Sequence, residues 1–314
     1  MTVVRTVLGD IPPERLGVTD YHEHLFQRSP LLPGEDLDDA AASEQEAAAL
    51  RGAGADAMVD ATPIGLGRNP VQVAAISRRT GLHVVHVTGL HREPHYPVGS
   101  EVLAAPVDRL AARLRGELLE DMRSPGCDDG AEGSPVRAGA LKAGIGLWSV
   151  TPFERRAIAA VGQVAAGTGA PVMVHLEHGS AAHEVLDLLA EDGVAADRVA
   201  LAHVDRNPDP GLHAELAARG AYLGYDGAAR HQRWPDSVLL DCLAAVVAAG
   251  YGERLLLGGD VARRSRYVAY GGMPGLAYLL TRFVPRVRAA VGEAATDAVL
   301  RGNPARWLAW APPR

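Results

Sequence analysis

The segment Gly17-Val18-Thr19-Asp20-Tyr21-His22-Glu23-His24-Leu25 contains two histidines that are two residues apart, in a stretch of β-strand character. Successive side chains of a strand point to opposite faces. His22 and His24 are therefore expected on one face, where both imidazoles can bind the same metal ion. An isolated His-x-His pair also occurs by chance near protein surfaces. The polar residues on the other strands decide between these two interpretations.

Eight short β-rich runs alternate with segments of helical composition. The predicted strands are Val18–Phe26, Ala57–Thr62, His83–Gly89, Ala138–Ala143, Pro171–Leu176, Val199–Val204, Ala221–Tyr225 and Leu255–Gly259. Helices are predicted between them, for example at Arg155–Thr168 and Ala181–Asp192. This alternation is typical of a parallel α/β fold, which is either a closed barrel or a doubly wound open sheet.

Residues that can bind metal ions lie at or just beyond the C-terminal ends of these strands. Besides the two histidines of the first strand, they are Lys142, His175, His203 and Asp260. A barrel brings all strand ends to one rim, whereas an open sheet spreads them apart. We therefore predict one α/β domain over residues 1–314, a (β/α)8 TIM barrel with a metal site at its C-terminal rim.

The segment Gly116–Arg137 interrupts the alternation of strands and helices. It is rich in Gly, Pro, Asp and Glu, which is typical of loops. We predict a long mobile loop there, and the sequence assigns it no particular role.

Three of the candidate ligands follow apolar strands. A lone histidine in such a place is more often a hydrogen-bonded structural residue than a ligand, but His175 and His203 come after the His-x-His pair, which favours a metal site. Asp260 follows three leucines and two glycines. A buried carboxylate needs a cationic partner, and this partner is either a metal ion or one of Arg263 and Arg264.

Lys142 is the only lysine in the chain, because thirty of the 31 Lys and Arg residues are arginines. It lies among small apolar residues, where burial is expected to lower the pKa of its amine and to leave part of it neutral. A neutral amine adds carbon dioxide. The resulting carbamate has two anionic oxygens that can bridge two cations, and a guanidinium cannot form it. The alternative is that the one remaining lysine lies here by chance.

The composition limits the partners and the compartment. The formal net charge is −7 and the pI is about 5.9, so we expect neither nucleic acid nor membrane as a partner. Cys127 lies in a polar stretch and Cys242 in an apolar helical pattern, which predicts no disulfide framework. The stretch Met1–Gly17 has no apolar run of the kind that signal peptides contain, and we expect a cytoplasmic protein.

In the order of its motifs, nearly the whole chain resembles the phosphotriesterase family of the amidohydrolase superfamily. The matching motifs are Gly17–Leu25, Asp60-Ala61-Thr62-Pro63, Thr88-Gly89-Leu90, Lys142, Thr168–His175, the strand before His203, Gly258-Gly259-Asp260 and Asn303-Pro304-Ala305. Each motif alone is weak, and the set in this order is specific.

The resemblance implies a binuclear hydrolase site. The expected cofactors are two divalent ions, Zn²⁺ first and Mn²⁺ or Co²⁺ as alternatives, with CO2 bound as a carbamate on Lys142. One buried ion would be held by His22, His24 and Asp260, and a more exposed ion by His175 and His203. Carboxylated Lys142 and a hydroxide would bridge the two ions. The expected catalytic residues are Asp260, Lys142 and His203. Asp260 is expected to accept the proton of the hydroxide-forming water and to pass it either to the leaving group or outward to solvent by way of His203 and Asp205.

The substrate is expected to be a small, anionic ester, lactone or amide. Arg263, Arg264 and Tyr267 follow the last strand, and Arg264 and Tyr267 are similar to the phosphate-binding Arg and Tyr of phosphosugar lactonases in the family. The lysine of that group is missing, and Arg230 or Arg233 is the candidate to replace it. These arginines could also form a solvated loop.

Two other functions remain open at this point. One is a broad phosphotriesterase or lactonase with an apolar leaving-group pocket, although the low aromatic content of 5% disfavours it. The other is a catalytically silent metal-binding barrel. The family resemblance also suggests a homodimer.

Overall fold

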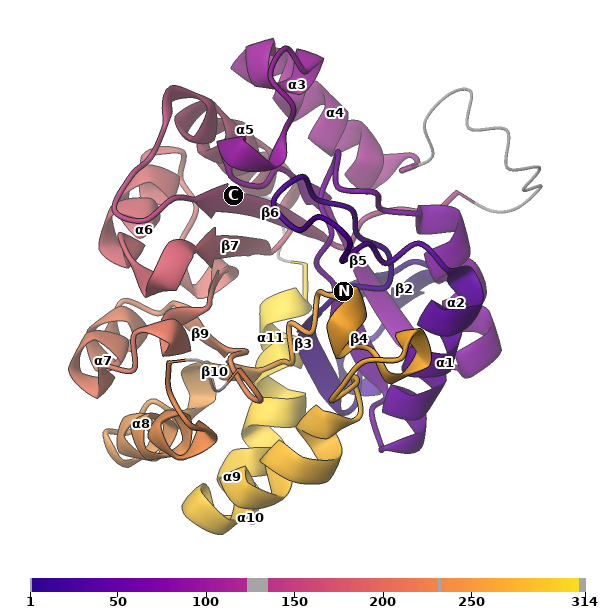
Figure 1. Ribbon diagram of the computed structural model, residues 1–314. Helices are drawn as coiled ribbons and strands as arrows, with labels where there is room; N and C mark the ends of the chain where they lie inside the picture. Colours follow the sequence, from indigo (N-terminus) through magenta and orange to yellow (C-terminus); the bar gives the residue numbers. More distant parts are fainter. Residues whose placement is uncertain (1, 123–134, 231–232, 311–314) are drawn as a thin grey trace.

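The computed structural model describes residues 2–122, 135–230 and 233–310. Eight parallel strands form one sheet in the order β10-β9-β8-β7-β6-β5-β4-β3. The first and last strands of this order meet where the amide of Asp260, just after β10, donates to the carbonyl oxygen of His22 in β3 at 2.8 Å. The sheet is therefore a closed barrel, as predicted, and Figure 1 shows the helices arranged around the strands.

All eight predicted strands are present, with their ends moved by at most three residues. The barrel strands are β3 (Thr19–Glu23), β4 (Ala57–Asp60), β5 (His83–Gly89), β6 (Ala140–Ile145), β7 (Val172–Leu176), β8 (Val199–Ala202), β9 (Tyr222–Tyr225) and β10 (Leu255–Leu257). An antiparallel hairpin of β1 (Val4–Thr6) and β2 (Gly9–Ile11), which the sequence analysis did not predict, precedes them.

The α-helices follow the strands around the barrel. They are α1 (Ala40–Gly52), α2 (Pro70–Thr80), α3 (Glu101–Ala104), α4 (Val107–Leu119), α5 (Pro152–Thr168), α6 (Ala182–Glu191), α7 (Pro210–Ala218), α8 (Asp236–Ala248), α9 (Val284–Val291), α10 (Glu293–Asp297) and α11 (Asn303–Leu308).

The ends of α5 show how the local sequence sets a helix. The Thr151 side chain accepts from the amide of Glu154, and the Glu154 side chain accepts from the amide of Thr151, which satisfies two free donors of the first turn. Pro152 occupies the first helical position, where its missing N–H costs nothing. Gly169 ends the helix at φ 74°, in the left-handed region.

The prediction of a loop over Gly116–Arg137 was wrong for its first residues. Residues 116–119 form the last turn of α4, because Leu114 and Leu118 continue the buried face of that helix past Gly116. The helical spacing of these leucines outweighs the helix-breaking tendency of a single glycine. Residues 123–134 of the predicted loop lie outside the described part of the chain.

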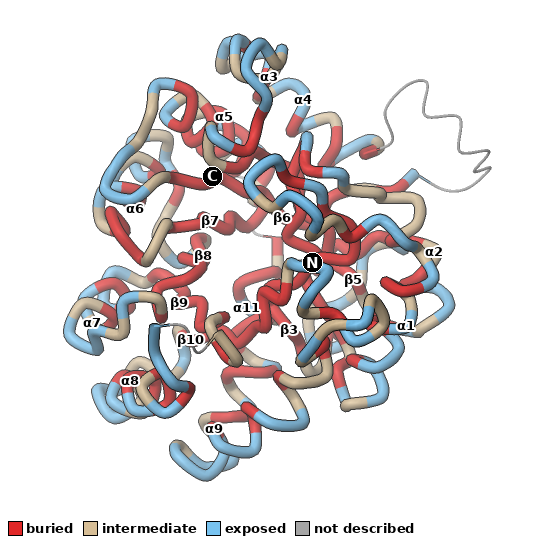
Figure 2. The backbone as a smooth tube through the Cα atoms, in the orientation of Figure 1, coloured by how far each residue is buried: buried red, intermediate tan, exposed pale blue. Residues whose placement is uncertain are grey.

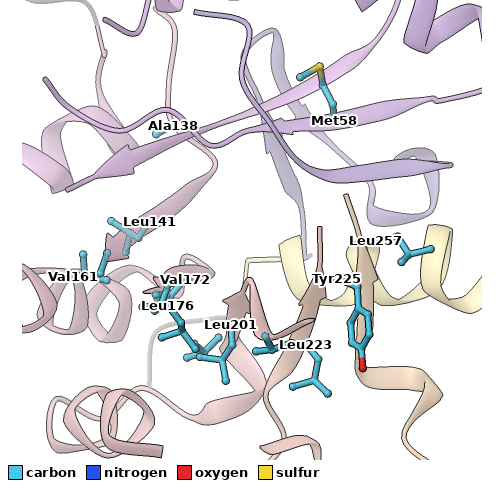
Figure 3. Packing of buried hydrophobic residues seen from close by; sticks show 14 of the residues in the cluster. Met58, Ala138, Leu141, Val161, Val172, Leu176, Leu201, Leu223, Tyr225 and Leu257 are labelled. Atoms are coloured by element: carbon cyan, nitrogen blue, oxygen red, sulfur yellow. The ribbon is translucent and has the colours of Figure 1, made fainter. Parts of the chain in front are cut away.

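Two apolar layers hold the barrel together. The outer layer lies between the strands and the helices, and Figure 3 shows Leu141, Val172 and Leu201 of this layer on successive strands. The inner layer fills the barrel and contains Val59 and Met173. Figure 2 shows that the strands are buried while the outer faces of the helices are exposed.

Helix α11 closes one end of the barrel. Trp307 is fully buried in the inner layer, and its indole N–H donates to the carbonyl oxygen of Val172, at the start of β7, at 3.3 Å. This end of the barrel is therefore filled with apolar side chains, and the polar residues gather at the opposite end, where the strands finish.

None of the helices in the described residues combines the length and the apolar character that a membrane crossing requires.

Candidate metal centre

The six predicted metal ligands come together in the structure. Five lie at or just beyond the C-terminal ends of their strands, and Lys142 lies in the middle of β6. All six are buried, and all six line one cavity of about 290 Å³. The other residues around this cavity are Gln27, Leu31, Leu32, Leu66, His91, Arg92, His95, Glu177, Arg206, Arg230, Ala262 and Arg263. A second cavity of about 380 Å³ lies beside Trp148 and α6, and none of the predicted site residues lines it.

Strand β3 is irregular at the His-x-His motif. Its register with β4 shifts between Asp20 and Glu23. As a result the neighbouring side chains of Tyr21 and His22 both reach Asp226, although a regular strand would point them to opposite faces. Room for the Tyr21 ring comes from Gly224, since a Cβ atom there would overlap the tyrosine hydroxyl.

His22, His24 and Asp260 converge on one point. Oδ1 of Asp260 lies 3.4 Å from Nε2 of His24 and 3.8 Å from Nε2 of His22, and one ligand atom from each residue lies within 4.8 Å of the others. The Nδ1 atoms of the two rings are engaged elsewhere. That of His24, for example, lies 2.8 Å from Oγ1 of Thr62. Two imidazoles and a carboxylate, turned toward one point by outer hydrogen bonds, fit a divalent ion.

His203 and His175 lie next to this group. Their ring centroids are 4.5 Å apart, and that of His203 is 5.0 Å from the ring of His22. Nε2 of His175 lies 3.1 Å from Glu177, whose Oε2 also accepts from Arg92 at 3.0 Å, so Nδ1 of His175 is the nitrogen left for a metal. This pair offers two nitrogen donors for a second ion.

Lys142 points from the middle of β6 into the same cavity. Its Nζ atom lies 2.9 Å from the carbonyl oxygen of Ala61 and 3.4 Å from Nε2 of His22. Burial lowers the pKa of the Lys142 amine to about 8, although nearby carboxylates, Asp260 first, act in the opposite direction. The amine is therefore partly neutral near neutral pH, which is the form that adds CO2.

The charges of the site suit metal binding. Burial lowers the pKa of His22 to about 4 and that of His203 to about 3, so both imidazoles are neutral at pH 7. Burial alone would raise the pKa of Asp260, but the guanidinium of Arg230 and the imidazole of His22 hold it well below its usual range. Neutral imidazoles and an ionised carboxylate are the forms that bind divalent ions.

Two of the candidate ligands have a strained backbone. His203 has φ 67° and Asp260 has φ 41°, both in the left-handed region that favours glycine. Such conformations cost on the order of 1–3 kcal/mol each and persist where the surrounding structure enforces them, often at functional sites.

The structure divides the predicted substrate-binding residues into two groups. Arg230 and Arg263 line the cavity. Arg264 lies outside it, 4.0 Å from Asp38, with its guanidinium over the Tyr270 ring. Arg233 is likewise outside, with Nη1 3.3 Å from His178. Tyr267 is fully buried, and its hydroxyl donates to the carbonyl oxygen of His24.

Sequence reasoning missed several residues of the site. Arg92 and Arg206 both line the cavity, and Arg206 donates to Oδ2 of Asp260 at 2.9 Å, beside Arg230, which donates to the same oxygen. Asp226 lies below the cavity and follows β9 directly. All three residues come within a few positions of a strand end, which is the signal that could have identified them.

The expected proton path runs through His203 and Asp205. Among the described residues, no direct hydrogen bond joins these two side chains. Nδ1 of His203 lies 2.6 Å from Asp226, and Asp205 accepts from the amide of Gly227 at 2.7 Å. Burial raises the pKa of Asp205 to about 8, with Asp226 adding to the effect. Asp226, in contrast, has a pKa well below its usual range, because His203 and His22 outweigh its burial.

The chain is similar to known proteins over nearly its full length. It is 30% identical to a phospho-furanose lactonase of Mycoplasmopsis synoviae, with 98% of this chain and 91% of that protein aligned. It is 26% identical to an N-acetyltaurine hydrolase of Tetraodon nigroviridis, with 97% of each aligned. The crystal structure of a lactonase from Listeria monocytogenes superposes with a TM-score of 0.88 at 29% identity, covering 99% of this chain and 100% of the other.

These relatives are hydrolases, and their similarity spans the barrel and the residues of its rim. The sequence model of the phosphotriesterase family matches residues 2–308, which include all six candidate metal ligands. The chain therefore belongs to the phosphotriesterase family.

Proposed function

We propose that this chain is a binuclear metal-dependent hydrolase that opens a small, anionic lactone or ester. One observation carries the proposal: two imidazoles, a carboxylate and the only lysine converge in a cavity that is also lined by four arginines. The imidazoles belong to His22 and His24, and the carboxylate to Asp260.

Divalent ions bound by this set would lower the pKa of water and polarise a carbonyl oxygen. His22, His24 and Asp260 would hold one ion, and His175 and His203 the other. Lys142, as a carbamate formed from its neutral amine and CO2, would supply the ligand shared between them. In this proposal Asp260 accepts a proton from the water, and its contacts with Arg206 and Arg230 support one fixed orientation of its carboxylate.

The charge around the cavity favours an anionic substrate. Arg92, Arg206, Arg230 and Arg263 line it, against the carboxylates of Glu177 and Asp260. Guanidinium groups form paired hydrogen bonds with phosphate, sulfonate or carboxylate oxygens. The apolar lining is limited to Leu31, Leu32, Leu66 and Ala262, and it gives little support to a broad phosphotriesterase with an apolar leaving-group pocket.

The names of the relatives fit this substrate class. A phosphorylated furanose lactone and N-acetyltaurine are both small molecules that carry an anionic group and a hydrolysable carbonyl. The first is a lactone and the second an amide, so an assay must compare these two kinds of bond. We favour the lactone, because lactonases occur both among the relatives and among the similar structures.

The cellular setting is a proposal of the same kind. We propose a cytoplasmic homodimer that acts on a free small molecule, with neither nucleic acid nor membrane as a partner. The acidic composition supports the absence of those partners, and the dimer rests on the family resemblance alone.

The test combines metal content with a substrate screen on the same sample. The purified chain is analysed for metals, stripped with a chelator, and reloaded with Zn²⁺, Mn²⁺ or Co²⁺. Each form is assayed with phosphorylated and neutral lactones, N-acyl amino acids, N-acetyltaurine and aryl phosphotriesters. We expect about two ions per chain, loss of turnover on stripping, and turnover of anionic lactones after reloading.

Each other outcome changes the conclusion in a defined way. Faster turnover of N-acetyltaurine would assign an amidase, and faster turnover of aryl phosphotriesters would assign the broad phosphotriesterase. Two bound ions with no turnover of any substrate class would support a catalytically silent barrel. A chain that binds no ion would overturn the metal-dependent function.

A further inference from the structure

Asp226 connects two histidines below the cavity. Its side chain is fully buried, with one carboxylate oxygen 3.0 Å from Nδ1 of His22 and the other 2.6 Å from Nδ1 of His203. The hydroxyl of Tyr21 donates to the first of these oxygens. Asp226 does not line the cavity, so it is not placed to touch a substrate.

A second interpretation of this cluster is a metal site of its own, because His22, His203 and Asp226 lie close enough to share an ion. The hydrogen bonds argue against it. The carboxylate oxygens already accept from Tyr21 and from the Nδ1 side of each ring, and an ion there would replace these contacts in a fully buried place. The geometry therefore points to an orienting role.

The carboxylate decides which nitrogen of each histidine carries hydrogen. An ionised carboxylate only accepts hydrogen bonds, so both Nδ1 atoms must be the protonated ones. Each Nε2 atom then keeps its lone pair. For His22 this lone pair faces Asp260 and Lys142 in the cavity.

The two histidines belong to different ions in the proposed function, on which this inference rests. We propose that Asp226 is a positioning residue that couples the two metal positions, because one carboxylate sets the tautomer of a ligand in each. The other two histidines have separate partners: His24 contacts Thr62, and His175 contacts Glu177.

The conservative variant Asp226→Asn tests whether this one carboxylate sets the tautomers of both histidines. An amide has one acceptor oxygen and one donor nitrogen, so it can accept from one imidazole but must donate to the other. The second histidine is then forced to carry its hydrogen on Nε2, where the metal would bind. We expect the bound metal to fall from about two ions to one or fewer, with an affinity loss of about 10–100-fold.

The matched controls separate positioning from structural support. Thr62→Val removes the partner of His24 alone and should weaken one ion only. Tyr21→Phe removes the hydroxyl that contacts Asp226 but keeps the carboxylate, so it should retain both ions, even if it lowers the thermal midpoint. Zn²⁺ stoichiometry and affinity are measured by elemental analysis and competition with a chelator of known affinity.

A second readout needs no metal. In the stripped wild-type chain, ¹⁵N NMR of labelled histidine should show His22 and His203 protonated on Nδ1, and in Asp226→Asn one of the two should switch to Nε2. Unchanged tautomers with two tightly bound ions in Asp226→Asn would overturn the inference while leaving the proposed function intact. Loss of both ions to the same extent in Tyr21→Phe or Thr62→Val would overturn it as well. A wild-type chain that binds no Zn²⁺ at all would overturn both the inference and the proposed function.

Discussion

The Nζ atom of Lys142 lies 3.4 Å from Nε2 of His22, so the only lysine of the chain touches the first histidine of the His-x-His motif. Lys142→Arg keeps the positive charge but cannot form a carbamate. We expect this variant to lose metal affinity and turnover by at least about 100-fold, the upper end of what an outer partner of a ligand contributes. Elemental analysis and the lactone assay measure the two losses.

Arg78→Lys is the matched control for this exchange, because Arg78 is exposed on α2 and the variant adds a lysine away from the site. It should behave as wild type. ¹³C NMR after exposure to labelled bicarbonate should show a carbamate signal in the wild-type chain that is absent from Lys142→Arg. Full metal content in Lys142→Arg would remove the carbamate from the proposed site.

Arg263 and Arg264 are neighbours in sequence, and only Arg263 lines the cavity. Arg263→Ala should raise the KM of an anionic lactone about fivefold, as expected for about 1 kcal/mol at an exposed ion pair. The KM of a neutral lactone should change little. Arg264→Ala, which removes a contact with Asp38 and Tyr270 outside the cavity, should leave both values unchanged. The reverse pattern would place the anion-binding group on Arg264, as the sequence resemblance suggests.

The raised pKa of Asp205 predicts that the stability of the folded chain depends on pH. Its pKa is raised to about 8 in the folded chain, above the ordinary value of about 4, so the folded state binds a proton more tightly than the unfolded state. The associated stability is fully present below pH 4 and is lost as the pH rises to about 8, by at most about 1.4 kcal/mol per pH unit. Asp205→Asn can keep the bond from Gly227 and cannot ionise.

We therefore expect the thermal midpoint of metal-free Asp205→Asn to rise relative to wild type between pH 5 and 8 and to match it more closely at lower pH. Glu191→Gln, at an exposed position on α6, controls for the loss of one charge. A constant difference between Asp205→Asn and wild type across this range would contradict the buried, protonated carboxyl.

Trp307 should be important for stability and unimportant for the chemistry. Trp307→Ala opens a cavity at the closed end of the barrel and should lower the free energy of unfolding by about 3–5 kcal/mol. Trp234→Ala, at a side chain that is 44% exposed, should cost about 0.5 kcal/mol or less. Urea denaturation measures both. The metal content of folded Trp307→Ala should stay at the wild-type value, and its loss would show that the two ends of the barrel are coupled.

The fold and the candidate ligands could be predicted because both depend on strand ends. Once eight strands alternate with helices, residues such as His175 and His203 at successive strand ends must meet if the sheet closes. No long-range detail is needed for that step. The lysine could be identified from composition alone, because every other basic position in the chain is an arginine.

The substrate-binding side chains were harder to predict because their directions depend on loop geometry. Tyr267 follows the short 3₁₀ turn at Arg264–Arg266, and this turn brings its hydroxyl to the carbonyl oxygen of His24 below the rim. Asp226 precedes a glycine, and an Asp-Gly pair after a strand usually indicates only a turn. Its role depends on the irregularity of β3 that places Tyr21 and His22 over it, and the alternation of a regular strand does not predict this.

The close approach of Tyr21 to Gly224 links the choice of residue at these two positions. Any side chain at position 224 would occupy the volume of the phenol ring, so an enlargement there requires a smaller residue at position 21. The exchange would also remove a donor from Asp226. Relatives with a bulkier residue on β9 should therefore carry a compensating change on β3, and the two positions should vary together in evolution and in any redesign of this barrel.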